Sequence, residues 1–474
     1  MMDLVARLAD IVGERHVLVD AEAQAPFLTD WLGKYRGAAA AIVRPGSTEE
    51  VAGVMTLCTA RRIPVVPQGG NTSMSGGATP DMSGRAIVLS LTRMNRIRAV
   101  DPIGNAMTVD AGAVLAKVQE AAKAAGRFFP LSLGAEGSCT IGGNLAANAG
   151  GGAVLRYGTM RELTLGLEVV LPDGRIWDGL TALRKDNTGY ALRDLFIGSE
   201  GTLCVITGAV LKLFPQPLAR ATAFVALRDA NAALSLLSSV RARCGDRLTA
   251  FEFMTGACLS LILKHSAEAR LPLGAVPPAA VLIELSDTDD ELALTERLEG
   301  ALAEAVETEI VLDAAIAQDG VQAKAFWRIR EGVSEALVRE GKAAKHDVSV
   351  PVAAMADFVA AADAAVIAAA PGVRPIVFGH LGDGNLHYNL LPRMGQSDAD
   401  FAALAPELTR IVHDETCKRR GSISAEHGIG QLRVSEMPRC KAPIELDLMR
   451  SLKTLFDPHG LLNPGKLLPA PVEN

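Results

Sequence analysis

Residues 64–80, PVVPQGGNTSMSGGATP, are the stretch that decides the fold, because an apolar strand pattern ends there in a glycine-rich loop. Its glycines, Gly69, Gly70, Gly76 and Gly77, let successive backbone N–H groups turn towards a ligand and approach it closely. Small polar residues between them add side-chain donors, so the loop suits a phosphate or pyrophosphate without any Lys or Arg. The alternative is a plain turn, which so many glycines in one short loop make the weaker interpretation.

Two further glycine-rich segments follow: residues 133–158, LGAEGSCTIGGNLAANAGGGAVLRYG, and residues 185–207, KDNTGYALRDLFIGSEGTLCVIT. Both mix glycines with apolar residues and few charges, which is typical of a cleft around a large, partly apolar cofactor. Each one alone is also compatible with a structural loop. No strand-to-helix G-x-G-x-x-G motif with a following acidic residue is present, which argues against an NAD-type domain. Residues 460–466, GLLNPGK, have P-loop spacing but lack the Ser or Thr that must follow.

Composition divides the chain into zones. With 474 residues, the chain is long enough for two or three domains. From about residue 40 to residue 215, short apolar runs alternate with glycine-rich loops, which predicts an α+β domain. Strands and Ala/Leu-rich helices then alternate to about residue 371, and the chain from about residue 401 is mainly helical. A net charge of -7 argues against a nucleic-acid partner.

The seven cysteines are scattered and form no CxxC pair, which argues against a disulfide framework, a thiolate zinc site or an iron–sulfur centre. Such usage predicts a cytoplasmic protein. Residues 1–16 have the pattern of an amphipathic helix rather than of a signal peptide. The apolar stretch at residues 352–370 contains Asp357 and Asp363, so we expect an Ala-rich helix and no transmembrane segment.

Histidines and a carboxylate form a second constellation. His380 and His387 lie in residues 378–390, FGHLGDGNLHYNL, where two glycines predict a strand–turn–strand that brings both imidazoles together. Glu426 lies in residues 424–430, SAEHGIG. Two histidines and a carboxylate are a common open ligand set for zinc. The alternative is a pair of histidines hydrogen-bonded in a turn-rich core, and the HExxH signature of metalloproteases is absent.

A cationic cluster lies between these motifs. Arg328 and Arg330 fall in a helix pattern, Ser334 follows Arg330 by one turn, and Lys345 precedes an apolar strand. A solvated helix face explains most such arginines, whereas a lysine beside an apolar strand is a better candidate for binding an anion.

Seven motifs together resemble the D-2-hydroxyglutarate and D-lactate dehydrogenase branch of the vanillyl-alcohol-oxidase type flavoprotein family: PQGGNTSMSGG, LGAEGSCTIGGNLAANAGG, RKDNTGYALRDLFIGSEGTL, KHDVSVP, FGHLGDGNLHYN, SAEHGIG and FDPHGLLNPGK. The resemblance covers nearly the whole chain. It implies an α+β fold with a two-part FAD-binding domain at residues 1–217 and a substrate-binding cap at 218–400. A C-terminal helical portion at residues 401–474 would pack back on the FAD domain.

The resemblance also implies roles for individual residues. Those that would hold the FAD pyrophosphate are Pro67, Gly69, Gly70, Asn71, Thr72 and Ser75. Those that would line the flavin are Gly134, Ser138, Gly142, Gly143, Asn144, Asn148, Gly150, Glu200, Gly201 and Ile206. Zinc, or another divalent metal, would be held by His380, His387 and Glu426. Substrate carboxylates would meet Arg330, Lys345 and Asn389, and Ser334, also expected at the substrate, stands where the family often has Thr.

The expected reaction is the oxidation of a small anionic D-2-hydroxy acid, and D-2-hydroxyglutarate is the substrate that two buried cations favour. His427, beside Glu426, is the expected base for the hydroxyl proton. D-lactate or D-malate oxidation, a flavin subunit of a glycolate-type oxidase, a non-catalytic subunit and a zinc hydrolase are the alternatives. The first glycine loop has no His or Cys and the second has only Cys139, so we expect non-covalent FAD. An electron-transfer flavoprotein or a quinone would reoxidise it, and a homodimer stays open.

Overall fold

The structure is a computed structural model that describes residues 2–288 and 290–469. Its contacts divide the chain into two compact units, which are described separately. The first unit comprises Met1–Gly150, Gly158–Gln216 and Glu426–Asn474, and the second comprises Gly151–Tyr157 and Pro217–Ala425. The C-terminal portion expected at residues 401–474 is therefore divided, because residues 401–425 group with the second unit.

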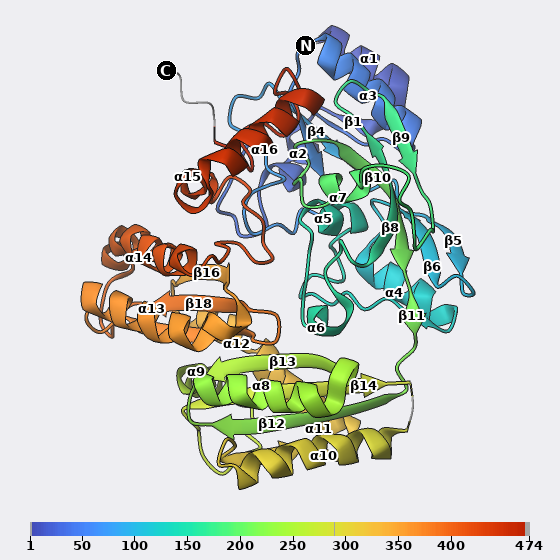
Figure 1. The fold of residues 1–474 in the computed structure, drawn as a ribbon. Helices are drawn as coiled ribbons and strands as arrows, with labels where there is room; N and C mark the ends of the chain where they lie inside the picture. The colour runs from blue at the N-terminus through green and yellow to red at the C-terminus, as the bar shows by residue number, and fades with distance from the viewer. Residues whose placement is uncertain (1, 289, 470–474) are drawn as a thin grey trace. The chain divides into compact units, whose positions relative to one another are not determined.

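The first unit contains two main sheets (Figure 1). In the first sheet, β2, β4 and β3 run parallel and β1 joins antiparallel at the edge. Its strands, in spatial order, are β1 (Val17–Leu18), β2 (Ala41–Val43), β4 (Ile87–Ser90) and β3 (Val65–Gln68). The second sheet is antiparallel, with the order β5 (Ile97–Asp101), β6 (Ala106–Asp110), β10 (Val205–Lys212), β8 (Thr164–Val170) and β9 (Ile176–Gly179).

Helices surround these sheets, and β7 (Arg127–Phe128) pairs with β11 (Phe214–Pro215). The helices of this unit are α1 (Met2–Val12), α2 (Ala21–Leu28), α3 (Thr48–Ala60), α4 (Leu115–Ala124), α5 (Ile141–Ala146), α7 (Leu192–Phe196), α15 (Met437–Cys440) and α16 (Pro443–Phe456). Helix α3 begins where the Ser47 hydroxyl caps the backbone N–H of Glu50, a common start signal for a helix.

The second unit is built on one seven-stranded sheet in which all strand pairs are antiparallel. Its order is β15 (Asp313–Ile316), β12 (Ala219–Leu227), β14 (Ala279–Asp287), β13 (Leu248–Thr255), β17 (Arg374–His380), β18 (Asn385–Leu391) and β16 (Ala344–Ser349). Its helices are α6 (Val154–Tyr157), α8 (Ala230–Cys244), α9 (Gly256–His265), α10 (Glu291–Glu307), α11 (Gly320–Glu331), α12 (Val333–Glu340), α13 (Met355–Ala369) and α14 (Asp398–Lys418).

Alternation along the strands gives this sheet two buried faces. One face carries residues such as Val281 and Tyr388, which join a core with α8, α10, α13 and α14. The other carries Phe224, Leu282 and Phe378, which join a core with α9, α11 and α12. We call the second of these the site face, because the candidate metal and substrate residues of this unit project from it.

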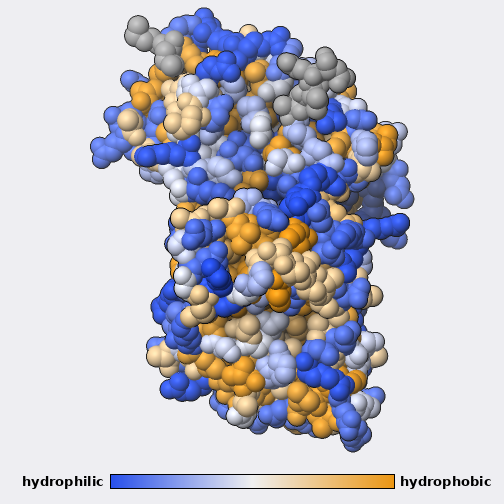
Figure 2. All heavy atoms as spheres, turned by 90° about the vertical axis from the view of Figure 1, so that its left-hand side faces the viewer, coloured by the Kyte–Doolittle hydropathy of each residue, from blue (hydrophilic) through white to orange (hydrophobic). Residues whose placement is uncertain are grey.

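Helix α13 with the turn before it, Val352–Ala369, is long and apolar enough to cross a membrane by length and composition alone. Only 22% of that window is buried, and Figure 2 shows hydrophobic residues gathered at the height of this helix. Phe358, Ala362 and Val366 recur at helical spacing and pack into the core, and Asp363 accepts a hydrogen bond from the Tyr388 hydroxyl at 2.6 Å. These contacts tie one face of the helix to the sheet.

Candidate active site

The first glycine loop begins where β3 ends at Gln68. The outer edge of β3 pairs with the C-terminal motif: Val65 N–H donates to Leu461 O, and Asn463 N–H donates to Val65 O, each at 2.8 Å. The side-chain amide of Asn463 donates to Gly77 O at 3.0 Å and to Glu200 O at 2.8 Å. The FDPHGLLNPGK motif therefore anchors the first glycine loop, which is a structural role and not that of a P-loop.

The first two glycine segments meet backbone to backbone. A Cβ added at Gly70 would overlap the carbonyl oxygen of Ser138 and lie 3.0 Å from its carbonyl carbon. A Cβ at Gly69 would overlap the Thr140 hydroxyl, and one at Gly142 would lie 2.8 Å from the Cβ of Ala111. Close packing alone therefore requires glycine here, whatever the loops bind.

We expect Gly70→Ala to force these two loops apart, at a cost of about 1–3 kcal/mol in stability for the overpacking. The flavin content of the purified protein should fall, because both loops line the expected cofactor site. Gly274→Ala is the matched control, since a Cβ there meets nothing within 4 Å. Flavin absorbance per chain and thermal unfolding midpoints measure both effects, and equal values for the two variants would contradict the expectation.

Buried polar atoms in these segments fit a polar cofactor. The Thr140 and Ser199 hydroxyls are buried and have no hydrogen-bond partner among residues 2–288 and 290–469. Buried polar groups are normally paired with protein, water or a ligand. These two lie in the second and third glycine segments, so the donor set fits the phosphate and ring oxygens of FAD.

Three predicted cofactor residues other than glycine have positive φ and use their side chains within the protein. Asn71 (φ 54°) donates to Thr29 O at 2.8 Å, and Asn148 (φ 50°) accepts from the Arg161 N–H at 3.0 Å. The Glu200 carboxylate (φ 51°) accepts the N–H groups of Ile429 and Gly430, both at 2.7 Å, and burial raises the pKa of Glu200. These side chains therefore shape the loops rather than stand free for a ligand.

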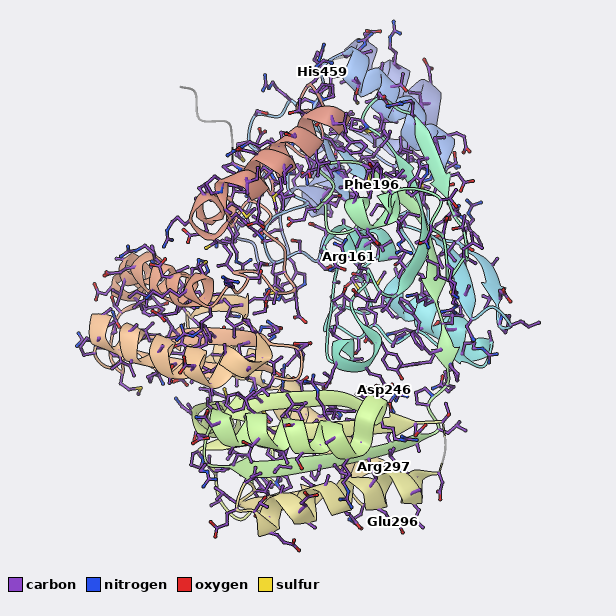
Figure 3. All side chains as sticks on the ribbon, in the orientation of Figure 1. Arg161, Phe196, Asp246, Glu296, Arg297 and His459 are labelled. Carbon is purple, nitrogen blue, oxygen red and sulfur yellow. The ribbon has the colours of Figure 1, made fainter. Side chains whose placement is uncertain are left out.

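Other contacts fix the third glycine segment and the last motif. Phe196, in α7 and labelled in Figure 3, has its ring centroid 5.8 Å from that of Trp177 and 5.4 Å from that of Phe456. Arg161 donates to the carbonyls of Asp194, within the same helix, and Ile197, which caps its C-terminus. The hydroxyl of buried Ser75 donates to His427 O at 2.9 Å, so Ser75 positions the segment that carries the predicted base.

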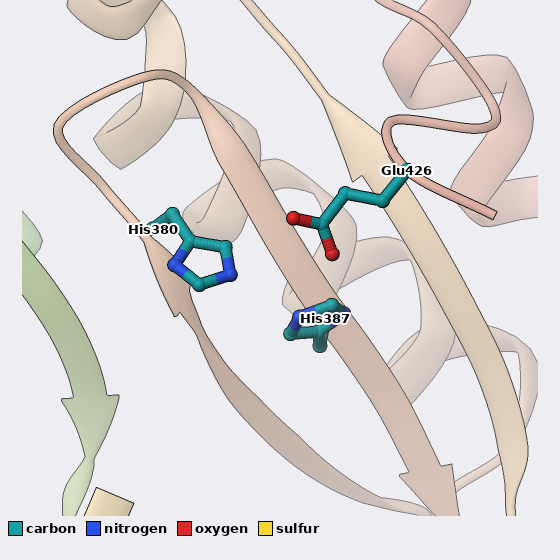
Figure 4. Close-up of side chains that lie close together, drawn as sticks. All are labelled: His380, His387 and Glu426. Carbon is teal, nitrogen blue, oxygen red and sulfur yellow. The ribbon is translucent and has the colours of Figure 1, made fainter. Parts of the chain in front are cut away.

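The hairpin β17–β18 brings the two predicted metal-binding histidines together. His380 ends β17 and His387 lies in β18, where it is paired with Phe378, and their ring centroids are 5.8 Å apart. Glu426 directly follows Ala425, whose N–H donates to Asp347 O at 3.2 Å. One ligand atom from each of His380, His387 and Glu426 lies within 4.8 Å of the others (Figure 4). This donor set fits zinc with room for further ligands.

Glu252 contacts His380 but is not one of the three possible metal ligands. It is 1% exposed and pairs with His380 across β13 and β17, so both side chains project from the site face. His380 Nδ1 lies 2.6 Å from Glu252 Oε1, and Arg330 Nε donates to Glu252 Oε2 at 2.7 Å. Burial would raise the pKa of Glu252, but the charges and hydrogen bonds of His380 and Arg330 outweigh it and hold that pKa below its usual range.

The predicted substrate residues fall into two groups. Lys345 and Asn389 are direct partners across β16 and β18, and Asn389 is also paired with Ile376, so both project from the site face with His387. Partial desolvation lowers the pKa of the Lys345 amine. Arg330 is 9% exposed, and its guanidinium is already engaged by Glu252 and stacked 4.8 Å from the Phe378 ring centroid. Ser334 lies beyond Gly332, in α12, and is exposed.

Sequence reasoning did not single out Glu252 or Asp347. Asp347 is 2% exposed, is paired with His387 across β16 and β18, and lies 3.9 Å from His387 Nδ1. Each is an acidic residue inside an otherwise apolar strand pattern. Such a residue could have been predicted to have a charged or hydrogen-bonding partner, because a buried charge must be paired. The partner of Glu252 is 128 residues away in the sequence, so the pattern alone does not name it.

Comparisons with known proteins identify the family of this chain. Residues 39–179 match the family described as FAD binding domain, and residues 216–467 match that described as FAD linked oxidases, C-terminal domain. A probable mitochondrial D-2-hydroxyglutarate dehydrogenase of Oryza sativa subsp. indica is 41% identical over 99% of this chain and 82% of its own length. A putative mitochondrial D-lactate dehydrogenase of Schizosaccharomyces pombe is 37% identical over 93% of this chain and 84% of its own.

Among solved structures, p-cresol methylhydroxylase superposes with a TM-score of 0.76 at 15% identity, over 98% of this chain and 96% of that one. The fold is therefore that of the vanillyl-alcohol-oxidase type flavoproteins, as the sequence predicted. Its FAD-binding domain makes the chain a flavin-dependent oxidoreductase. Within that class, the chain belongs to the FAD-linked oxidase family, in the branch of the D-2-hydroxyglutarate dehydrogenases.

The predicted cytoplasmic location is wrong against these relatives. The names of those from Oryza sativa, Arabidopsis thaliana and Bos taurus state a mitochondrial location. The prediction rested on seven cysteines, all of which are free here. Unpaired cysteines are typical of a reducing compartment, but they do not distinguish one reducing compartment from another.

Proposed function

We propose that this enzyme oxidises D-2-hydroxyglutarate to the 2-oxo acid, with FAD bound non-covalently and a zinc ion, or another divalent metal, at the site face. The observation that carries the proposal is the cluster of His380, His387 and Glu426, in which both histidines lie on the sheet that also presents Lys345 and Asn389. The names of the Oryza sativa and Bos taurus relatives support the choice of acid.

The first unit would bind FAD through its three glycine segments, and the second would supply the substrate side chains. When bound, FAD supplies the acceptor for the hydride that leaves the substrate Cα, and the metal supplies a Lewis acid for the hydroxyl and carboxylate. His380 and His387 contribute imidazole nitrogens to the metal, and Glu426 contributes a carboxylate oxygen. His427 takes the hydroxyl proton at an imidazole nitrogen.

The remaining side chains bind and orient the acid. Lys345 offers a point charge for the distal carboxylate, and the Asn389 amide offers donors beside it. Arg330 has one nitrogen engaged by Glu252, and its two terminal nitrogens form no hydrogen bond to the described residues, so they remain for a carboxylate. Ser334 adds a hydroxyl one turn beyond Arg330.

D-lactate is the second candidate substrate, favoured by the name of the Schizosaccharomyces pombe relative. D-Malate and a role as the flavin subunit of a glycolate-type oxidase share the same chemistry. Anaerobic bleaching of the flavin with a panel of D- and L-2-hydroxy acids tests all of these. Rapid bleaching by D-2-hydroxyglutarate supports the proposal, and bleaching by an L-acid alone overturns it. Adding an electron-transfer flavoprotein or a quinone separately to the reduced enzyme, and measuring which one reoxidises the flavin, identifies the acceptor.

FAD is expected to leave the protein on acid precipitation. Of the two glycine segments that would carry a tether, only the second contains a cysteine, Cys139, which is 2% exposed. Burial raises the pKa of its thiol, and the amide of Asn144 lies 3.6 Å from its sulfur. A thiol kept protonated is a poor nucleophile towards the flavin ring. Yellow colour should therefore appear in the supernatant, and colour retained in the pellet would contradict the expectation.

A further inference from the structure

We propose that Glu252 is a positioning residue for the metal site: it fixes the tautomer and ring orientation of His380, and Arg330 is the cation that pairs with its other oxygen. The inference rests on the metal site of the proposed function. It concerns a residue from a different strand, which is not among the groups that could themselves reach the ion.

Both oxygens of the Glu252 carboxylate are engaged, each by a different element. Oε1 meets His380 Nδ1 at 2.6 Å across β13 and β17, and Oε2 accepts from Arg330 Nε, in α11, at 2.7 Å. The side chain is 1% exposed, so both bonds are shielded from bulk solvent. Two fixed bonds leave the carboxylate a single orientation beneath the His380 ring.

The chemistry of the pair decides which nitrogen of His380 faces the metal. An ionised carboxylate accepts hydrogen bonds only, so the proton of His380 lies on Nδ1. The lone pair for a metal is then on Nε2. Carboxylates in this position orient histidine ligands and raise their basicity, and their loss typically lowers metal affinity about 10–100-fold.

Arg330 offsets the free-energy cost of burying the Glu252 carboxylate. A buried carboxylate without a cation is strongly disfavoured, and a guanidinium offers a fixed, permanent charge. Arg330 is held from a second side by Phe378, whose ring centroid is 4.8 Å from its guanidinium carbon and 5.0 Å from the His387 ring. One arginine thus connects the carboxylate behind His380 with an aromatic ring beside His387.

The test is the zinc affinity of Glu252→Gln, measured by competition with a chromogenic chelator on the FAD-loaded chain. Glutamine keeps the shape but has one acceptor and one donor end, whereas both neighbours donate. We expect zinc affinity to fall about 10–100-fold. Glu284→Gln is the matched control, because Glu284 is a buried carboxylate on the adjacent strand that accepts from Trp327 Nε1 at 2.8 Å and contacts no metal-site histidine.

The outcomes separate this inference from the proposed function. If wild-type protein binds no zinc, the metal part of the proposed function fails. If wild type and Glu252→Gln bind zinc equally, only the role of Glu252 is overturned. Flavin content and thermal unfolding show whether each variant is folded.

A second measurement needs no variant of Glu252. Nitrogen-15 spectra of histidine-labelled, zinc-loaded wild-type protein report which ring nitrogen carries the proton, and His380→Gln assigns the signal among the eight histidines. We expect a protonated Nδ1 and a metal-bound Nε2 for His380. A metal-bound Nδ1 would overturn the proposal.

Discussion

His387→Ala should abolish turnover while leaving the flavin spectrum intact. The change removes one of three ligand atoms that lie within 4.8 Å of each other, so metal content should drop well below one per chain. A Lewis acid is worth several kcal/mol of transition-state stabilisation, so we expect kcat to fall on the order of a thousandfold. Metal analysis, the flavin spectrum and turnover with D-2-hydroxyglutarate are the measurements.

His346→Gln is the control for this experiment. His346 is a buried histidine on β16, but it projects to the opposite face, where its ring bonds Tyr388 O and the Thr409 hydroxyl. The His346→Gln variant should therefore keep both its bound metal and its activity. Chelation of the wild type should reproduce the His387→Ala result, and full activity in a metal-free preparation would remove the metal from the mechanism.

The second large effect is on substrate choice. Lys345→Met should lower kcat/KM for D-2-hydroxyglutarate far more than for D-lactate, because only the former has a distal carboxylate. Losing one charged contact to a buried carboxylate costs about 2–5 kcal/mol, or roughly 30-fold or more. Lys342→Met is the matched control, since Lys342 lies three residues earlier with a side chain that is 74% exposed.

Arg330→Ala is expected to behave differently from Lys345→Met. It should also damage D-2-hydroxyglutarate oxidation more than D-lactate oxidation, but both acids should lose, because Arg330 supports Glu252 as well. The comparison requires both acids on all the variants. Equal losses for the two acids in Lys345→Met would mean that this lysine does not hold the distal carboxylate, and the preference for a dicarboxylate would lose its main support.

Sequence patterns predicted individual strands, helices and turns better than they predicted which of these elements lie side by side in the fold. The glycine loop at residues 69–77 and the hairpin that joins His380 to His387 follow from local rules for turns and strands. The role of Glu252 does not follow from local rules. The pattern FEF at residues 251–253 is typical of a buried strand, but it does not show which strand lies beside it. Likewise α14 has an ordinary amphipathic pattern, which does not say that it covers the seven-stranded sheet rather than the FAD domain.

Arg330 is a second residue whose buried partner the sequence did not predict. The helix pattern gave its neighbours along the chain, and a guanidinium near a lysine suggested a free anion site. The structure gives it a carboxylate partner 78 residues away. Long-range pairing of buried charges depends on sheet order, which no local pattern contains.

The anchoring of β3 by Leu461 and Asn463 has a consequence for how the chain is made. During synthesis the first glycine loop emerges long before Leu461 and Asn463, the residues that cover its strand edge. Until then β3 presents an unpaired edge, which is a place where chains aggregate. The nascent chain therefore cannot close this edge of the sheet until residues 461–463 have been made.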